Sequence, residues 1–119
     1  MRLQEGSILK GPEGSIATKV YIADTFRSRR KGVLGRPALD PDEALVIARC
    51  GQVHTFGVPY ELDVVFCDHD MRVLHVETLA PGRMSKRVAR SRLCVELLGG
   101  RAAACGVVAG AVLRIEGPA

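Results

Sequence analysis

The sequence predicts a mainly β single domain at the border of the α+β class, a compact antiparallel β-barrel or sandwich-like fold with one or two short helices. Six short segments have the apolar patterns of strands, whereas one segment carries the start and stop signals of a clear helix. The chain has 119 residues, 47% of them hydrophobic, so it is long enough to bury one core without disulfides or a structural metal. We therefore treat residues 1–119 as one domain and expect residues 1–14 to be loosely ordered.

A strand followed by a helix is predicted in the first third of the chain. Residues 15–22 alternate β-branched residues with other side chains, which is typical of a strand with one buried face. The helix that follows can be capped by Asp24 or Thr25 and runs to about Leu34. Gly35 is placed to end it, since glycine readily adopts the conformation that closes a helix.

The middle of the chain is predicted to hold a short strand and a β-hairpin. Residues 39–43 have the composition of a turn, and residues 44–48 form a short, fully apolar strand. Strand chemistry resumes at residues 62–66, and residues 72–77 form the return arm of the hairpin. Residues 67–71 are polar enough to make its tight tip.

The last third of the chain combines an exposed segment with two further strands. Residues 80–92 carry five basic side chains but little apolar content, so we expect an exposed and mobile excursion. Residues 93–98 form a strand that includes Glu96. Residues 101–105 can make one helical turn, and residues 112–115 form the last strand.

Composition excludes several classes of protein. Charged residues make up 25% of the chain and the net charge is +4, so the chain lacks the signature of disorder, and no apolar run is long enough to span a membrane. Near the N-terminus, Glu5 and Lys10 interrupt the apolar run that a signal peptide needs. We therefore expect a cytoplasmic protein that has no membrane as its partner.

The cysteines and histidines do not predict a metal site. No Cys-x-x-Cys pair is present, so we expect four reduced thiols in a cytosol. The histidines lack the spacing of a helical metal motif, and the glycine-rich stretches lack the context of a phosphate-binding loop. We therefore predict neither a metal nor a cofactor. The cysteines concerned are Cys50, Cys67, Cys94 and Cys105.

Ten of the 17 basic residues lie in two clusters, which would form a positive patch if they shared one face. A net charge of +4 is ordinary for a soluble domain, and no aromatic residues interleave with the second cluster to stack on bases. Charge therefore does not favour nucleic acid as the partner. The clusters are Arg27, Arg29, Arg30, Lys31 and Arg36, and Arg83, Lys86, Arg87, Arg90 and Arg92.

Three blocks of residues carry a resemblance to a known family. Residues 23–36 contain Ala-Asp-Thr, then Arg29 and Gly-Val-Leu, and residues 54–68 contain His-Thr-Phe-Gly-Val and Leu-Asp-Val-Val-Phe. Residues 95–110 contain Val-Glu-Leu-Leu-Gly-Gly and Gly-Val-Val-Ala-Gly. Together they resemble the family called domain of unknown function 192, although Ala111 stands where that family usually has Asp. The resemblance implies a mainly antiparallel barrel or sandwich-like fold with short helices at one end, and no established activity.

The candidate binding site rests on a basic and an acidic residue in apolar surroundings. Arg29 shares a helix face with Val33 and so leans toward the core, and Asp63 lies in the most apolar strand, where a buried carboxylate needs a partner. A guanidinium meets a carboxylate through two parallel hydrogen bonds. We therefore predict an Arg29–Asp63 pair that either fastens the helix to the sheet or binds a ligand. The predicted site residues are Arg29, His54, Phe56, Asp63 and Glu96.

The leading hypothesis is a non-enzymatic binding module for a small polar ligand or a protein partner, with no catalytic residue. One alternative is a hydrolase-like enzyme in which Asp63 orients His54 as a general base, although no nucleophile motif accompanies them. Another is an adaptor that docks an acidic protein or nucleic acid through the two basic clusters. Ligand identity and oligomeric state stay open.

Overall fold

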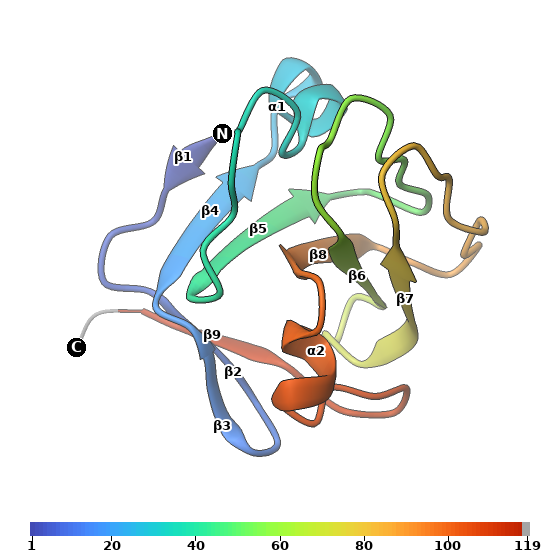
Figure 1. Cartoon of the computed structure of the whole chain (residues 1–119). Helices are drawn as coiled ribbons and strands as arrows, with labels where there is room; N and C mark the ends of the chain where they lie inside the picture. Colours follow the sequence, from blue (N-terminus) through green and yellow to red (C-terminus); the bar gives the residue numbers. More distant parts are fainter. Residues whose placement is uncertain (118–119) are drawn as a thin grey trace.

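The computed structural model describes residues 1–117, apart from the Phe26 side chain, and arranges the strands in two sheets with two short helices (Figure 1). The large sheet contains, in spatial order, β1 (Arg2–Leu3), β4 (Lys19–Ala23), β5 (Glu43–Ala48), β8 (Leu93–Leu98), β6 (Leu62–Cys67) and β7 (Val73–Leu79). The small sheet contains β3 (Gly14–Ala17), β2 (Ile8–Gly11) and β9 (Arg114–Glu116). The helices are α1 (Phe26–Lys31) and α2 (Arg101–Ala104). The mainly β prediction is confirmed, but the two sheets do not close into a barrel and the arrangement is sandwich-like.

The predicted strand at residues 15–22 is in fact two strands, β3 and β4, one in each sheet. The chain changes sheet at Thr18, whose backbone N–H and hydroxyl both donate to the Asp42 carboxylate instead of to a neighbouring strand. The alternating side chains continue through this bend, which is why periodicity alone does not reveal it. Similarly, residues 1–14 contain β1 and β2, and Leu9 is fully buried, in contrast to the expected loose order.

α1 connects the one parallel pair of strands in the described sheets, β4 and β5. It begins at a reciprocal cap, because Ser28 N–H donates to Thr25 Oγ1 at 3.1 Å and Thr25 N–H donates to Ser28 Oγ at 3.1 Å. Gly32, at φ 51°, ends the helix three residues earlier than the predicted Gly35. The helix therefore presents its last turn to the large sheet.

Both faces of the large sheet are buried, which explains the apolar runs of its three central strands. One face packs against α2 and the small sheet, and the other packs against α1 and the connection between β5 and β6. Side chains alternate between these two faces along each strand. Val64 on β6 pairs with Glu96 on β8, so these two side chains face α1.

The predicted hairpin is confirmed as β6 and β7, and, although Ser85 is buried, most side chains of the basic segment 80–92 are exposed. Its backbone is nevertheless tied to the loop that follows β5. Thr55 N–H donates to Arg83 O, and Ser85 N–H donates to Val53 O, each at 2.8 Å. Neither α1 nor α2 has the length or apolarity that a helix needs to cross a membrane, and no other helix occurs in residues 1–117.

Candidate functional site

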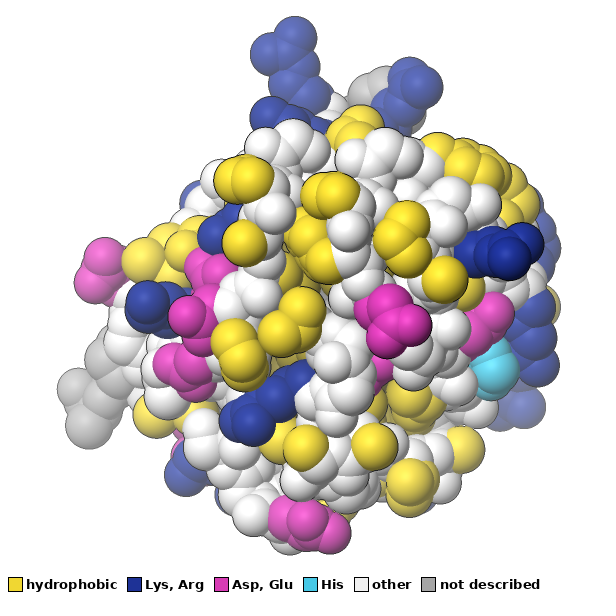
Figure 2. Space-filling model, in the orientation of Figure 1, with side chains coloured by type: hydrophobic (Ala, Val, Ile, Leu, Met, Phe, Trp, Pro, Cys, Tyr) yellow, Lys and Arg dark blue, Asp and Glu magenta, His cyan; other side chains and the backbone are white. Residues whose placement is uncertain are grey.

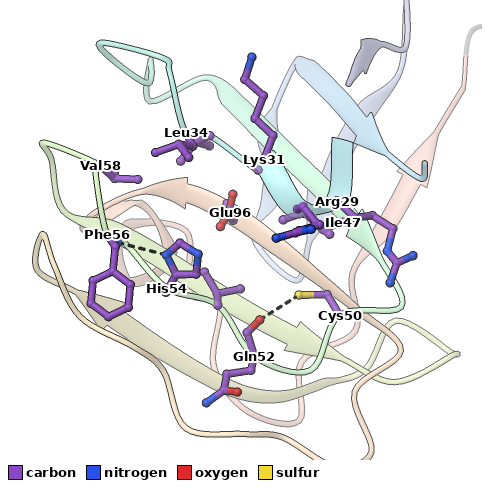
Figure 3. A pocket seen from close by; sticks show the side chains of 14 residues that line it. Arg29, Lys31, Leu34, Ile47, Cys50, Gln52, His54, Phe56, Val58 and Glu96 are labelled. Carbon is purple, nitrogen blue, oxygen red and sulfur yellow. Dashed lines mark hydrogen bonds between the residues drawn. The ribbon is translucent and has the colours of Figure 1, made fainter. Parts of the chain in front are cut away.

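A pocket lies between the last turn of α1, the loop that follows β5 and the middle of β8 (Figure 3). Its volume is about 70 Å³, and apolar side chains from the chain just after α1, from β5 and from the loop form much of its wall. Four of the five predicted site residues line it: Arg29, His54, Phe56 and Glu96. The fifth, Asp63, does not.

Glu96 supplies the buried polar group of this pocket. The residue is 3% exposed, and in Figure 3 its carboxyl group lies at the centre of the labelled side chains. Oε1 is buried and has no hydrogen-bond partner among the described residues. Burial, assisted by the nearby Cys50, raises the pKa of Glu96 to about 8, against a smaller opposing effect of the Val33 backbone N–H. The group is therefore a neutral carboxylic acid at pH 7 and can donate as well as accept a hydrogen bond.

Arg29 supplies a second unpartnered group. Its Nη2 donates to the backbone oxygen of Arg49 at 3.4 Å, whereas Nε is buried with no partner among the described residues. The prediction that Arg29 turns inward is correct. A buried polar group that has no hydrogen-bond partner costs roughly 1–3 kcal/mol. Arg29 and Glu96 each carry such a group, and a ligand in the pocket could supply the missing hydrogen bonds.

The predicted Arg29–Asp63 pair is wrong. Asp63 is 1% exposed, and its Oδ1 accepts from Thr78 Oγ1 at 2.7 Å. Its Oδ2 accepts from the backbone N–H groups of Gly100 at 3.0 Å and Ala102 at 2.9 Å. Because side chains alternate along β6, Asp63 faces α2 and not α1. Its hydrogen bonds hold the start of α2 to the sheet.

His54 and Phe56 lie at the exposed rim of the pocket. Their rings are stacked with centroids 5.0 Å apart, and Phe56 N–H donates to His54 Nδ1 at 3.2 Å. Since Asp63 faces the other side of the sheet, it cannot orient His54. The hydrolase-like alternative therefore loses the pair on which it rested.

Sequence reasoning missed Cys50, which lines the pocket beside Arg29. Its thiol donates to the backbone oxygen of Gln52 at 3.4 Å. Hydrogen bonding with Cys94, then the Gln52 backbone and the positive charge of Arg29, outweigh burial and lower the pKa of Cys50 to about 7. No local motif marks this cysteine, because its place beside the pocket depends on the distant segment that precedes β8, where Ser91 Oγ donates to Cys50 O at 2.7 Å.

A second hollow of about 330 Å³ adjoins the pocket and is strongly basic. It is lined by Arg29 and Arg30 from α1, by Arg49 after β5 and by Arg87 from the exposed segment. Members of the two basic clusters, Arg29 and Arg30 from the first and Arg87 from the second, therefore line one hollow. Figure 2 shows Lys and Arg side chains gathered at the top and along the right edge of the molecule, above the parts that Figure 1 assigns to α1 and to the segment before β8.

The residues available for a cofactor or metal are few. The part of the chain that the structure describes contains no group of three or more His, Cys, Asp or Glu side chains placed to hold a metal ion. The pocket itself is lined by one carboxyl group, Glu96, together with Arg29, Arg30 and Lys31. This set of side chains suits an anion better than a cation.

Comparisons with known proteins place the fold but not an activity. Residues 8–115 match the family DUF192, described as "Uncharacterized ACR". None of the curated proteins matches the chain. A crystal structure of a protein of unknown function from Novosphingobium aromaticivorans has 21% identity and a TM-score of 0.79, covering 91% of this chain and 82% of that one. One from Sinorhizobium meliloti, described as a "putative transcription regulator", has 20% identity and a TM-score of 0.76, covering 91% and 90%.

Proposed function

The chain belongs to the DUF192 family, and, since that family is described as uncharacterised, we propose from the site alone that the α1 pocket binds a small organic carboxylate without changing it chemically. The observation that carries this proposal is that Arg29 and Glu96 both line the pocket and that each has a buried polar atom without a hydrogen-bond partner among the described residues, Arg29 Nε and Glu96 Oε1. A ligand oxygen that reaches both removes their desolvation cost.

Charge supports an anionic ligand. Glu96, the one acid that lines the pocket among the described residues, is neutral at pH 7 because burial raises its pKa to about 8. Three cationic side chains, Arg29, Arg30 and Lys31, line the same space. A carboxylate would accept from the Arg29 guanidinium and from the Glu96 O–H, and such charge-assisted hydrogen bonds are the stronger kind.

The size of the pocket and its apolar lining support a ligand with a short hydrocarbon part. The cavity of about 70 Å³ accommodates only a few heavy atoms. Leu34, Val58 and Phe56 line the pocket, and Leu34 and Phe56 are exposed. These apolar side chains would cover the hydrocarbon part of the ligand. Binding is favoured over hydrolysis because the contacts of His54 within residues 1–117 are with Phe56, and Asp63, the acid expected to orient it, faces α2.

The test compares propionate with its neutral isostere propionamide by chemical-shift titration of the amide signals. We expect propionate to bind at least tenfold more tightly, because only the carboxylate pairs with the guanidinium. Arg29→Gln should weaken propionate binding by about tenfold, the effect of one charge-assisted hydrogen bond of roughly 1.5 kcal/mol. Arg90→Gln is the matched control, because Arg90 is exposed and does not line the pocket. Equal binding of the acid and the amide would refute the proposal.

A second candidate function is docking of a nucleic acid on the basic hollow. The specific observation in its favour is that Arg29, Arg30, Arg49 and Arg87, from separate parts of the sequence, line one open space. One neighbour in fold is also described as a "putative transcription regulator". Fluorescence anisotropy with a labelled duplex tests this candidate, since binding through phosphates must weaken steeply as salt increases. An affinity that Arg87→Gln leaves unchanged, or that salt does not alter, would exclude it.

A further inference from the structure

We propose that Cys50 is a hydroperoxide-reactive thiol and that Cys94, beneath it on β8, completes a disulfide with the oxidised sulfur. This inference does not depend on carboxylate binding. It rests on the position of Cys50 in the wall of two hollows, on the neighbouring Cys94 thiol and on the unpartnered Glu96 carboxyl in the same pocket.

Cys50 is the accessible cysteine among the four. It is half-buried and lines both the α1 pocket and the basic hollow, whereas Cys67, Cys94 and Cys105 are buried. A small peroxide can therefore reach Cys50 through either hollow. Access and thiolate character together select which cysteine of a protein is oxidised first.

The path of the backbone brings Cys94 under Cys50. Ile47, near the end of β5, pairs directly with Cys94 on β8. Beyond β5 the chain continues beside the segment that precedes β8, because Arg49 N–H donates to Arg92 O and Ser91 Oγ donates to Cys50 O, each at 2.7 Å. Cys50 packs against the core cluster that contains Cys94, and the interaction with the Cys94 thiol is the largest cause that lowers the pKa of Cys50. Cys94 is thus within reach of a modified Cys50 while being shielded from solvent itself.

The charged groups around Cys50 favour its thiolate. Arg29 faces it from α1, and the backbone N–H of Gln52 faces it from its own loop. From β8, Cys94 and Glu96 face it, and burial raises the pKa of both, so both are protonated near neutral pH. With a pKa of about 7, roughly half of Cys50 is ionised at pH 7, compared with a few per cent of an ordinary cysteine.

The reaction balances in two steps. In the first, the Cys50 thiolate attacks the terminal oxygen of a hydroperoxide. A sulfur–oxygen bond forms, the oxygen–oxygen bond breaks, and the departing oxygen takes a proton, for which the neutral Glu96 carboxyl in the same pocket is a source.

In the second step the Cys94 thiol attacks the sulfur of the Cys50 sulfenic acid. A sulfur–sulfur bond forms, the sulfur–oxygen bond breaks, and hydroxide leaves as water with the proton of Cys94. Two thiols and one hydroperoxide thus give one disulfide, one alcohol or water from the peroxide, and one further water.

The test treats the reduced wild-type protein with hydrogen peroxide and maps its cysteines by peptide mass spectrometry. We expect a Cys50–Cys94 disulfide as the first product, a result that needs no variant. Cys94→Ser should accumulate a Cys50 sulfenic acid that dimedone traps, with Cys94→Ala as a second variant. Cys105→Ser is the matched control and should still form the disulfide. First oxidation at Cys67 or Cys105 would overturn the proposal.

The rate of oxidation supplies a second readout. Cys50 in the folded protein should react about three- to tenfold faster at pH 6 to 7 than in the urea-unfolded chain, because its larger thiolate fraction outweighs the lower nucleophilicity of a more acidic thiol. The pH profile of this rate should have its midpoint near 7. Arg29→Gln should move that midpoint upward. A midpoint that coincides with that of the unfolded chain would contradict the assignment, whether or not propionate binds.

Discussion

Glu96 on β8 lies directly opposite Val64 on β6, so Glu96 and Asp63 point to opposite faces of the large sheet. The face of Glu96 carries α1 and the pocket, whereas the face of Asp63 carries α2. The two acids that sequence analysis assigned to one site therefore belong to two different parts of the molecule. Variants of each should have separable effects, on binding for one and on folding for the other.

Asp63→Ala should lower the free energy of unfolding by about 3 kcal/mol. The change leaves the backbone N–H groups of Gly100 and of the buried Ala102 without their acceptor and removes the bond from Thr78. Urea denaturation measures this loss. Thr78→Val, which removes one of the three bonds, should cost about 1 kcal/mol and leave propionate binding unchanged. A loss of propionate binding in Thr78→Val would show that Asp63 contributes to the binding site.

Asp70→Ala is the matched control for this comparison. Asp70 is an exposed carboxylate at the tip of the β6–β7 hairpin, and its contact with His69 at 3.4 Å is solvent-exposed. Its removal should change stability by less than about 0.5 kcal/mol. An equal loss in both variants would show that Asp63 has no special role in holding α2.

Glu96→Gln should flatten the dependence of stability on pH. The folded protein keeps the Glu96 proton up to a pKa of about 8, whereas the unfolded chain loses it near 4.5. Between these values the folded state binds more protons, so the free energy of unfolding falls as pH rises, by at most about 1.4 kcal/mol per pH unit. Wild type should therefore lose stability relative to Glu96→Gln as pH increases from 5 to 7.

Urea denaturation at several pH values measures this difference. The difference between the free energies of unfolding of the two proteins removes the contributions that they share. These come from the histidines and from the carboxylates whose pKa values are lowered, such as Asp68 and Glu43. The comparison is made below pH 7. Above that pH the lowered pKa of Cys50 makes the free energy of unfolding rise with pH, which opposes the effect of Glu96. Parallel pH profiles of wild type and Glu96→Gln would show that Glu96 ionises normally.

Gly32→Ala should disturb both folding and the pocket. Gly32 has φ 51°, and an added Cβ would lie 3.2 Å from Glu96 Oε1. We expect a loss of roughly 1–3 kcal/mol from backbone strain, together with weaker propionate binding. Gly35→Ala is the matched control, because it also has a positive φ but its added Cβ would meet only the flexible end of Lys31. Propionate binding that both variants weaken equally would contradict a contact with Glu96.

Thr25→Ala should destabilise α1 by about 1 kcal/mol, because it removes the acceptor for the Ser28 N–H at the start of the helix. The helix has six residues and positions Arg29, so propionate binding should weaken along with stability. Thr25→Ser keeps the hydroxyl and should restore both. Thermal unfolding and the propionate titration measure the two effects. A stable Thr25→Ala protein with unchanged binding would mean that packing alone holds α1.

Several local features follow from neighbouring residues. The hairpin of β6 and β7 was predictable because two strand-forming segments flank a short polar tip, and α1 was predictable from its cap at Thr25. The inward turn of Arg29 was predicted from its spacing to Val33 on a longer helix, although α1 ends at Lys31 and Val33 lies beyond it. Each of these properties depends on residues within one or two turns, or on one strand and the next.

Properties that depend on distant segments were not predictable. Asp63 accepts from the backbone N–H groups of Gly100 and Ala102. Since every residue except proline has such a group, the residue types along the chain do not show which one bonds to Asp63. The change of sheet at Thr18 is set by Asp42, which lies far along the chain. Cys50 is held beside the pocket by the segment before β8, since Ser91 Oγ donates to Cys50 O.

The amino-acid sequence by itself determined the fold class, the family, the central strands and four of the residues that line the pocket. Apolar periodicity and helix capping are local, so they can be read along the chain. Only the tertiary structure decided which face each buried polar group points to, because that choice depends on the register between β6 and β8. Desolvation and the nearest hydrogen-bond donor then give Asp63 a structural role and leave Glu96 and Arg29 open to a ligand.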